Sequence, residues 1–269
     1  MKKVVVYQSI GNESLSEEYQ RMHEEMLAKF GIKNVTSSAR AWRSSRDSYF
    51  IVLKDDYDDM IAGMRIEIGS PGNPMPLHKA VNQLIDRESH EALFEDYTNS
   101  CVAEICGLWS QRRTAKLGLG IIKLLKCSVV VAPYLGIKKI YGFGAAANVR
   151  LSKKLGFVQS HHIGDNGVFN YPSHKITSTV MHQDDLIKLN GADPIHRADM
   201  LNLRKRPMQE RREQTKVGPI LIRYDLFSEL NVPQIVGQDM PYQNFVEKPE
   251  KLAIPKVLKG KAQSSKDDA

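Results

Sequence analysis

The chain has 269 residues, of which 42% are hydrophobic and 26% are charged, and its formal net charge is +7. This length and balance suit one large globular domain, or a domain with an appendage, and they exclude a wholly disordered chain. No apolar run reaches the ~18 residues that a membrane-spanning helix needs, and the apolar stretch within Met1–Tyr7 is too short for a signal peptide.

The net charge of +7 allows a nucleic-acid-binding hypothesis. The positive excess is concentrated in Arg197–Arg212 and in the tail Lys248–Lys266, without interleaved aromatic residues. Such runs are commonly solvated surfaces, so nucleic-acid binding is the weaker interpretation. A basic surface equally suits anionic small molecules or an acidic protein partner.

The three cysteines do not indicate a disulfide framework. Cys101 and Cys106 lie five apart on an expected strand and so face opposite sides, and Cys127 has no evident partner. His161 and His162 have no further ligands at metal-binding spacing. We therefore expect free thiols, no metal site and a cytoplasmic protein in a reducing environment.

Hydrophobic periodicity predicts the elements of the first hundred residues. Ser14–Glu17 has the pattern of a capping box and would open a helix that ends before Gly31. Ile61–Ile68 alternates apolar with charged residues, as a strand with one buried face does. The expected elements are a strand at Val4–Gln8, the helix up to Phe30, a short helix at Ala39–Arg46, a hairpin of Tyr49–Leu53 and Ile61–Ile68, and short helices at Leu77–Asp86 and Ser89–Tyr97.

The second part of the chain alternates strands with helices. Its expected elements are a central strand at Val102–Ser110, a helix at Leu119–Leu135, a strand at Ile137–Phe143, a helix at Ala146–Leu155, strands at Val168–Tyr171 and Ile176–His182, a partly helical Asp193–Met208 and a strand at Ile220–Tyr224. The predicted fold is α/β, a mixed twisted sheet of roughly six to eight strands flanked by helices. Residues 1–230 would form this domain, and residues 231–269 a basic, loosely ordered C-terminal extension.

The segment Glu104–Gly120 has the pattern of a phosphate cradle. It passes from an apolar strand through a basic segment to glycines at the first turn of a helix. The first amides of a helix lack internal partners and lie at the positive end of its dipole, and glycines let a phosphate approach them closely. The segment lacks the third glycine of a dinucleotide fingerprint and the Gly-Lys-Ser/Thr of a P-loop.

This order of elements, closed by Leu155-Gly156-Phe157, resembles the GNAT superfamily of acyltransferases. The resemblance implies transfer of an acyl group from a thioester, acyl-coenzyme A or an acyl-carrier protein, to a primary amine. It implies no metal cofactor. The residues that it assigns to the thioester donor are Leu108, Trp109, Ser110, Arg112, Arg113, Lys116, Leu117, Gly118, Leu119 and Gly120.

The resemblance also implies catalytic positions. Glu104 stands where several members have a glutamate that deprotonates the amine, and burial in an apolar strand would raise its pKa towards neutrality. A salt-bridged or edge-exposed glutamate is an equal alternative. Ser152 stands where a tyrosine acid is frequent, and its hydroxyl is a poor acid. Ala115 replaces the usual Arg or Gln before the glycines, so a catalytically degenerate coenzyme-binding module is also possible.

These departures favour one branch of the superfamily. Met64–Glu67 followed by a Pro-rich loop and then Ala103-Glu104-Ile105 resembles the N-acyl-amino-acid and acyl-homoserine-lactone synthases. In that branch Arg65 would bind a substrate carboxylate, and the acceptor would be a small molecule such as an amino acid. The alternative is that Arg65 lies on the exposed face of a hairpin. Gly107 departs from the branch, which commonly has an arginine there.

Overall fold

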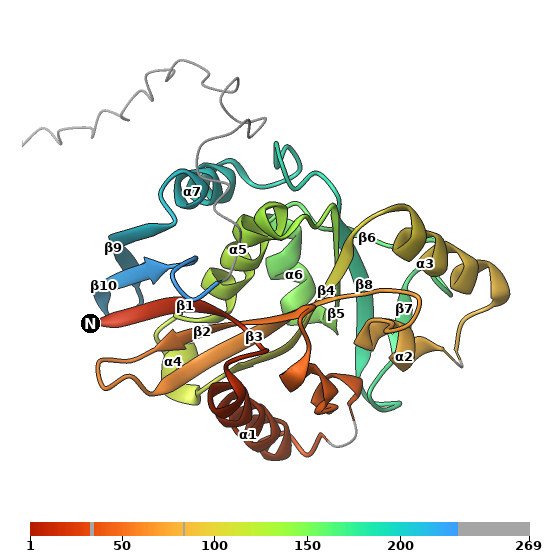
Figure 1. Cartoon of the computed structure of the whole chain (residues 1–269), viewed down its shortest axis with the longest axis horizontal. Coiled ribbons are helices and arrows are strands. Elements are labelled where there is room, and N and C mark those ends of the chain that lie inside the picture. Colours follow the sequence, from red (N-terminus) through yellow and green to blue (C-terminus); the bar gives the residue numbers. More distant parts are fainter. Residues whose placement is uncertain (33–34, 83, 231–269) are drawn as a thin grey trace, which may run out of the picture. The chain divides into compact units, whose positions relative to one another are not determined.

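A mixed sheet of ten strands is the centre of the computed structural model, which describes residues 1–32, 35–82 and 84–230 (Figure 1). The strands run in the order β6-β8-β5-β4-β3-β2-β1-β10-β9, and β7 pairs with β8. Their bounds are β1 Lys2–Gln8, β2 Ser48–Lys54, β3 Met60–Ile68, β4 Val102–Ser110, β5 Lys139–Ala145, β6 Val158–Gln159, β7 Val168–Asn170, β8 Thr177–Gln183, β9 Met208–Thr215 and β10 Gly218–Asp225.

Helices cover both faces of this sheet (Figure 1). The α-helices are α1 Glu13–Lys29, α2 Pro76–Val81, α3 Arg87–Asn99, α4 Arg112–Lys116, α5 Ile121–Val131, α6 Ala146–Lys154 and α7 Pro194–Lys205. Short 3₁₀ helices are η1 Thr36–Ser38, η2 Ala41–Ser44 and η3 Ala132–Leu135.

The α/β class is confirmed, but the prediction of six to eight strands is too low. The two strands that sequence patterns missed are β6 and β9. β6 has only two residues, and β9 is a charged edge strand that alternates exposed and half-buried side chains. Neither has an apolar face, so hydrophobic alternation gave no signal for them.

One face of the sheet packs against α5 and α7. The buried side chains of α5, which include Leu124 and Val129, belong to the same core as Ile51 and Ile105 of the strands. Met200 of α7 joins this core. Residues of α5 are buried nearly all round, because the helix lies between the sheet and α7.

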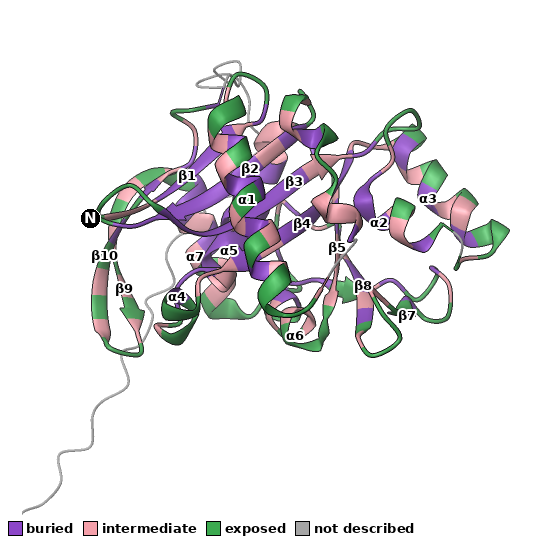
Figure 2. Ribbon diagram, turned by 90° about the horizontal axis from the view of Figure 1, so that it is seen from below, coloured by how far each residue is buried: buried purple, intermediate pink, exposed green. Residues whose placement is uncertain are grey.

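The opposite face packs against α1 and, further along the sheet, α2 and α3 (Figure 2). Tyr19 of α1 and Trp42 of η2 lie on Phe50 of β2, with ring centroids 5.4 to 5.9 Å apart. Trp109 of β4 joins the same aromatic cluster. Because helices cover both faces of the sheet, residues of the central strands are buried on either face.

The predicted capping box at the start of α1 is wrong. The helix begins at Glu13, one residue earlier than Ser14, and its N-cap Asn12 makes no side-chain cap hydrogen bond. The helix follows a turn in which the amide of Asn12 donates to the carbonyl of Ser9 at 3.1 Å. The Glu13 carboxylate accepts instead from the amide of Gly11, at 3.0 Å.

The described residues lie within one compact unit. None of the helices in these ranges is both long and apolar enough to cross a membrane. The C-terminal extension predicted at residues 231–269 lies outside the described residues.

Candidate functional site

The strands β4 and β5 separate part-way along their length. They pair in parallel from Val102 and Lys139 only as far as Ile105 and Gly142. Beyond this point β4 stays paired with β3 up to Ser110, while β5 stays paired with β8. The edge of β4 that faces β5 therefore has no partner strand over its last five residues, so no neighbouring strand uses the backbone groups on that edge.

A β-bulge lies where the separation begins. Gly63 of β3 pairs with Trp109 and Arg65 with Cys106, so β4 contains one residue more than β3 in this interval. Gly107, within the bulge, has a φ of +58°, a backbone conformation that residues other than glycine rarely adopt. The hydroxyl of Tyr19 donates to the Gly107 carbonyl at 2.5 Å and so fastens α1 to the bulge.

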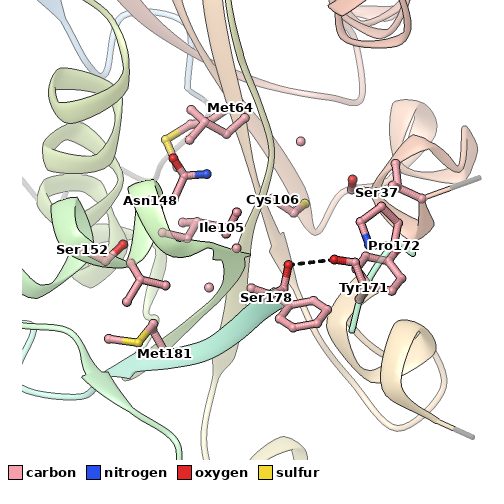
Figure 3. Close-up of a pocket in the computed structure, with 18 of the residues that line it drawn as sticks. Ser37, Met64, Ile105, Cys106, Asn148, Ser152, Tyr171, Pro172, Ser178 and Met181 are labelled. Atoms are coloured by element: carbon pink, nitrogen blue, oxygen red, sulfur yellow. Dashed lines mark hydrogen bonds between the residues drawn. The ribbon is translucent and has the colours of Figure 1, made fainter. Parts of the chain in front are cut away.

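The gap opens into a cavity of about 220 Å³ (Figure 3). Its walls come from both faces of the sheet, since α1 and η1 supply one side and α5 and α6 the other. Most lining side chains are apolar, and they include Leu27, Met64, Ile105, Leu108, Leu125, Val149 and Met181. A passage of this kind suits a long, thin ligand that is mainly apolar.

Two of the residues predicted for the site meet in this cavity. Leu108 of β4 lines it, and so does Ser152 of α6, which is 8% exposed. The Ser152 hydroxyl makes no hydrogen bond to the described residues, and Asn148, one helical turn earlier, lines the same wall (Figure 3). Ser152 and Leu108, which are far apart in the sequence, therefore line one cavity.

The other predicted donor-binding residues lie beyond the end of β4. Trp109 is buried in the aromatic core under α1, and Leu119 is buried in the core around α5. Ser110 is half-buried, and its hydroxyl oxygen is 3.3 Å from where a Cβ on Gly120 would lie. The turn between α4 and α5 thus continues directly from the cavity end of β4.

The basic segment after β4 forms a short helix, α4, which the sequence patterns did not indicate. Three amides of the predicted cradle, those of Leu117, Gly118 and Leu119, donate to carbonyls of α4 at 3.0 to 3.3 Å. These three amides are consequently occupied within the chain. The following amides of Ile121 and Ile122, in the first turn of α5, make no hydrogen bond to the described residues.

Gly120 allows the backbone to enter α5 close to the sheet. Its φ is +103°, and a Cβ there would lie 3.2 Å from the Cβ of Ala62. The buried Thr114 stands beside it, and the Thr114 hydroxyl has no hydrogen-bond partner among the described residues. A side chain at residue 120 would strain this turn and close the approach to the amides of α5.

The cations around this turn differ in their pairing. Arg112 and Lys116 are exposed and form no ion pair with the described residues. Arg113, also exposed, pairs with Asp55 at 2.9 Å. Lys216, in the turn between β9 and β10, joins the group, since its amide donates to the Leu117 carbonyl at 3.2 Å.

Glu104 lies inside the sheet, on the face covered by α2. It is 3% exposed, and its carboxylate accepts from the amide of Leu77, in the first turn of α2, at 2.5 Å. Burial raises the pKa of the Glu104 carboxyl to about 8, although this hydrogen bond acts in the opposite direction. Glu104 does not line the cavity; Cys106, two residues further along the same face of β4, does.

Arg65 is buried, with 1% of its surface exposed, so the alternative that placed it on an open hairpin face is wrong. Its guanidinium pairs with Glu67 at 2.5 Å, donates to the Ser37 carbonyl at 2.8 Å and stacks 4.3 Å from the ring centre of Trp42. The sequence could not reveal this, because α1 and η2 cover the face that hairpin alternation marked as polar.

One nitrogen of Arg65, Nη1, has no hydrogen-bond partner among the described residues. It lies 3.1 Å from where a Cβ on Gly107 would be, and Gly107 lines the cavity. The guanidinium therefore occupies the space that a side chain at residue 107 would enter. This is the position at which the resembled branch has an arginine of its own.

The structure also brings to the cavity residues that the sequence did not single out. His23 of α1 lines it, as do Ser37 of η1 and Tyr171 at the end of β7. The Tyr171 hydroxyl accepts from the amide of Thr36 in η1 at 2.7 Å, and its carbonyl accepts from the Ser178 hydroxyl at 2.9 Å (Figure 3). The apolar periodicity of α1 gave no signal for His23, because the buried face of the helix also contains the polar residues Ser16 and Gln20.

No group of three or more His, Cys, Asp or Glu residues in the described ranges could hold a metal ion. His161 and His162 are outside any such group. Cys101, Cys106 and Cys127 are free thiols. Burial raises the pKa of the Cys106 thiol well above its usual value, so this cavity residue is a neutral thiol.

Comparisons with known proteins identify the fold. No protein-family model matches the chain, and no curated protein sequence matches it. Among solved structures, FeeM, an N-acyl amino acid synthase from uncultured soil microbes, superposes with a TM-score of 0.50 at 11% identity. The match covers 66% of this chain and 94% of FeeM.

The chain has a GNAT-like fold. Two further structures align less well. BjaI, a CoA-dependent acyl-homoserine lactone synthase, gives a TM-score of 0.48 at 9% identity, over 77% of this chain and 91% of BjaI. An acyl-CoA N-acyltransferase from Pseudomonas aeruginosa gives 0.44 at 12% identity, over 67% and 98%. At this identity the FeeM match concerns the fold, and the function has to be argued from the site.

Proposed function

We propose that this protein is an N-acyltransferase that moves an acyl group from a thioester to a primary amine. The observation that supports the proposal is the separation of β4 from β5 after Ile105 and Gly142, which opens into a largely apolar cavity. A thioester placed in this gap would lie along the unpaired edge of β4, where backbone groups can hold it as a neighbouring strand would.

The proposed reaction needs little chemistry from side chains. Backbone donors of β4 within Cys106–Ser110 would polarise the thioester carbonyl as the amine attacks it. A carbon–nitrogen bond forms, the carbon–sulfur bond breaks, and the proton lost by the amine balances the charge of the departing thiolate. Most of the rate enhancement would come from holding the two reactants together in the cavity.

The donor's phosphates would lie at the start of α5. The unpaired amides of Ile121 and Ile122 lie at the positive end of the α5 dipole, and the exposed side chains of Arg112 and Lys116 add positive charge nearby in the sequence. The resemblance assigned Lys116–Gly120 to the thioester donor. We accordingly propose that the pyrophosphate binds just after these residues, at the amides of Ile121 and Ile122. Either coenzyme A or the phosphopantetheine of an acyl-carrier protein has an anionic group for this position.

The acyl chain is proposed to be longer than acetyl. Apolar side chains from α1, β4, α5, α6 and β8 line the cavity, among them Leu27, Leu108 and Met181. Burying a methylene group there contributes about 0.8 kcal/mol, whereas an acetyl group would leave this surface uncovered. Preference for an octanoyl over an acetyl thioester is the direct expectation.

The acceptor is proposed to be a small amine with a carboxylate, such as an amino acid. The unpaired Nη1 of Arg65 lies behind Gly107 in the cavity wall, so a substrate carboxylate there would meet a buried positive charge. Glu67 already neutralises part of that charge at 2.5 Å. The carboxylate would therefore gain most by approaching from the Gly107 side.

Glu104 is proposed as the base and Ser152 as a weak donor to the thiolate. With a pKa of about 8, the Glu104 carboxyl is suited to exchange a proton near neutral pH. Since it does not line the cavity, the proton would pass through an intervening group or a water molecule on the Cys106 face of β4. Ser152 lies on the cavity wall, where its hydroxyl could hydrogen-bond the leaving sulfur.

Two measurements test the proposal. Isothermal titration with acetyl-, octanoyl- and palmitoyl-coenzyme A should give one binding site, with the longer chains binding more tightly. Thiol release from octanoyl-coenzyme A should then depend on an added amine. Absence of binding by all three thioesters, and by octanoyl acyl-carrier protein, would contradict the proposed function.

A non-catalytic thioester-binding module is the second candidate. It is favoured by Ser152, a poor acid on the cavity wall, and by Glu104, which lies behind that wall. Such a protein would bind octanoyl-coenzyme A without amine-dependent thiol release, and Glu104→Gln would leave its behaviour unchanged.

A further inference from the structure

The buried stripe of α1 contains one polar group that the fold leaves unsatisfied. Its buried residues are Ser16, Tyr19, Gln20, His23 and Met26. The hydroxyls of Ser16 and Tyr19 donate to carbonyls at 2.8 and 2.5 Å. The Gln20 amide group donates to Ser38 and accepts from Trp42, both at 2.9 Å. Among the buried polar side-chain atoms of this stripe, only the ring nitrogen Nδ1 of His23 has no hydrogen-bond partner among the described residues.

His23 is buried in the protein yet lines the cavity. It is 2% exposed, and it forms part of the wall on the α1 side together with Leu27 and Gly107. A buried polar atom without a hydrogen bond lowers stability, so its retention at a cavity wall points to a ligand that pairs with it. A leucine would fill this position in α1 at lower cost.

The surroundings keep the imidazole neutral. Burial, together with the nearby charge of Arg65, lowers the pKa of His23 to about 3, against a smaller opposite effect of Glu24. A neutral imidazole has one N–H and one nitrogen with a free lone pair. His23 can therefore accept a hydrogen bond within the cavity at any pH at which the protein would be assayed.

The place of His23 relative to β4 decides which substrate it would meet. The proposed donor enters along α5 and α6, on the opposite face of the sheet from α1. His23 of α1, Gly107 of β4 and Ser152 of α6 line one cavity, which adjoins the point where β4 separates from β5. A molecule in contact with His23 would thus approach the thioester carbonyl from the face that the donor leaves open.

We propose that His23 recognises the acceptor by accepting a hydrogen bond, at its unpaired ring nitrogen, from an N–H of the attacking amine. This inference rests on the proposed acyltransferase function. The hydrogen bond holds one N–H of the amine towards α1, so the nitrogen lone pair points to the carbonyl carbon at β4. His23 orients the amine and takes no proton, since the proton balances the thiolate in the proposed reaction.

The test separates the two substrates kinetically. Thiol release is followed with octanoyl-coenzyme A and a panel of free amino acids and simple amines, and KM values are measured with the fastest acceptor. His23→Leu should raise the KM of the acceptor about tenfold, the effect of losing one hydrogen bond. The KM of octanoyl-coenzyme A should stay unchanged. His23→Asn, which keeps a polar group at this distance, should recover much of the acceptor affinity.

His196 of α7 offers a matched control, because its Nδ1 is also buried without a partner among the described residues while the residue does not line the cavity. His196→Leu should change neither KM. Thermal unfolding of all three variants checks that each is folded. If wild-type protein releases thiol but His23→Leu keeps the wild-type acceptor KM, the role of His23 is overturned and the acyltransferase function stands. If wild-type protein transfers to no amine, both are overturned.

Discussion

Charged residues occur in two contrasting regions of this molecule. At the centre of the sheet, Arg65 and Glu104 are 1% and 3% exposed, and each is held by specific partners. At the turn between α4 and α5, Arg112 and Lys116 are exposed and form no ion pair with the described residues. Both regions adjoin β4, since Glu104 lies on this strand, Arg65 pairs with it, and α4 follows it directly.

The difference lies in what each region does in the absence of a ligand. A buried charge that loses its partner is strongly destabilising, so the partners of the central residues contribute to the stability of the fold. An exposed cation costs little whether or not it is paired, so those at the turn can be retained for binding alone. Substitutions should therefore affect stability in the first region and donor affinity in the second.

Arg65→Met should give the largest effect. It leaves the half-buried carboxylate of Glu67 without its partner and removes the stack on Trp42, so the free energy of unfolding should fall by about 3–5 kcal/mol. Urea denaturation measures this. Arg112→Ala, the matched arginine of the exposed region, should change it by no more than about 0.5 kcal/mol. Equal losses in the two variants would remove the distinction between the regions.

Glu104→Gln should change how stability depends on pH. The pKa of this carboxyl is raised from 4.5 to about 8 in the folded protein. The unfolded chain therefore releases the proton at lower pH, and the wild-type protein should lose stability as pH rises from 5 to 8, by roughly 2–4 kcal/mol. The glutamine variant should lack this loss while still accepting from the amide of Leu77. Urea titrations of both proteins at pH 5 and pH 8 give the change in the free energy of unfolding between these pH values. The same change in both proteins would show that Glu104 is ionised in the folded protein.

The same variant tests catalysis. If Glu104 is the base, Glu104→Gln should lower kcat about 100-fold and remove any rise in rate near pH 8, with little change in the KM of octanoyl-coenzyme A. Amine-dependent thiol release gives these values. Unchanged kcat in a stable Glu104→Gln protein would leave Glu104 with a structural role only, as a partner for the start of α2.

Arg112→Ala combined with Lys116→Ala should affect donor binding alone. The KM of octanoyl-coenzyme A should rise about three- to tenfold, and the effect should shrink at high salt because exposed charges are screened. Arg113→Ala is the control, since Arg113 is paired with Asp55 and is less available to a phosphate. A larger effect of Arg113→Ala would place the phosphates on the other side of α4.

Ser152→Ala should have the smallest effect, a decrease in kcat of less than about threefold, because a serine hydroxyl is a weak acid. The KM of the acceptor should not change. A loss comparable to that of Glu104→Gln would mean that Ser152 does more than hydrogen-bond the leaving sulfur.

Sequence patterns were most informative where one property dominates an element. β4 was predicted at Val102–Ser110, its observed bounds, because most of its residues are apolar. The hairpin of β2 and β3 was also predicted, but the burial of Arg65 was not, since it depends on α1 and η2, which are distant in sequence. β9 was missed because its exposed, charged residues pair only with β10 at the sheet edge.

The candidate site divides in the same way. Leu108 and Ser152 were named in advance only through the resemblance, which assigns positions along the strand, turn and helix, and both line the cavity. His23 and Tyr171 could not be named, since they reach the cavity from α1 and from the end of β7, and nothing local distinguishes them from packing residues. The formation of α4 was not anticipated, and the amides at Leu117–Leu119 donate to its carbonyls.

Hydrogen exchange in the presence of octanoyl-coenzyme A tests the central claim most directly, because it reports where along the chain the thioester binds. The account predicts that amides of β4 within Cys106–Ser110, and those at Ile121 and Ile122, become protected on binding. Amides of β4 before Ile105, already paired with β5, should not change. Binding of the thioester with protection elsewhere and none along Cys106–Ser110 would contradict the proposal that the gap between β4 and β5 holds the donor.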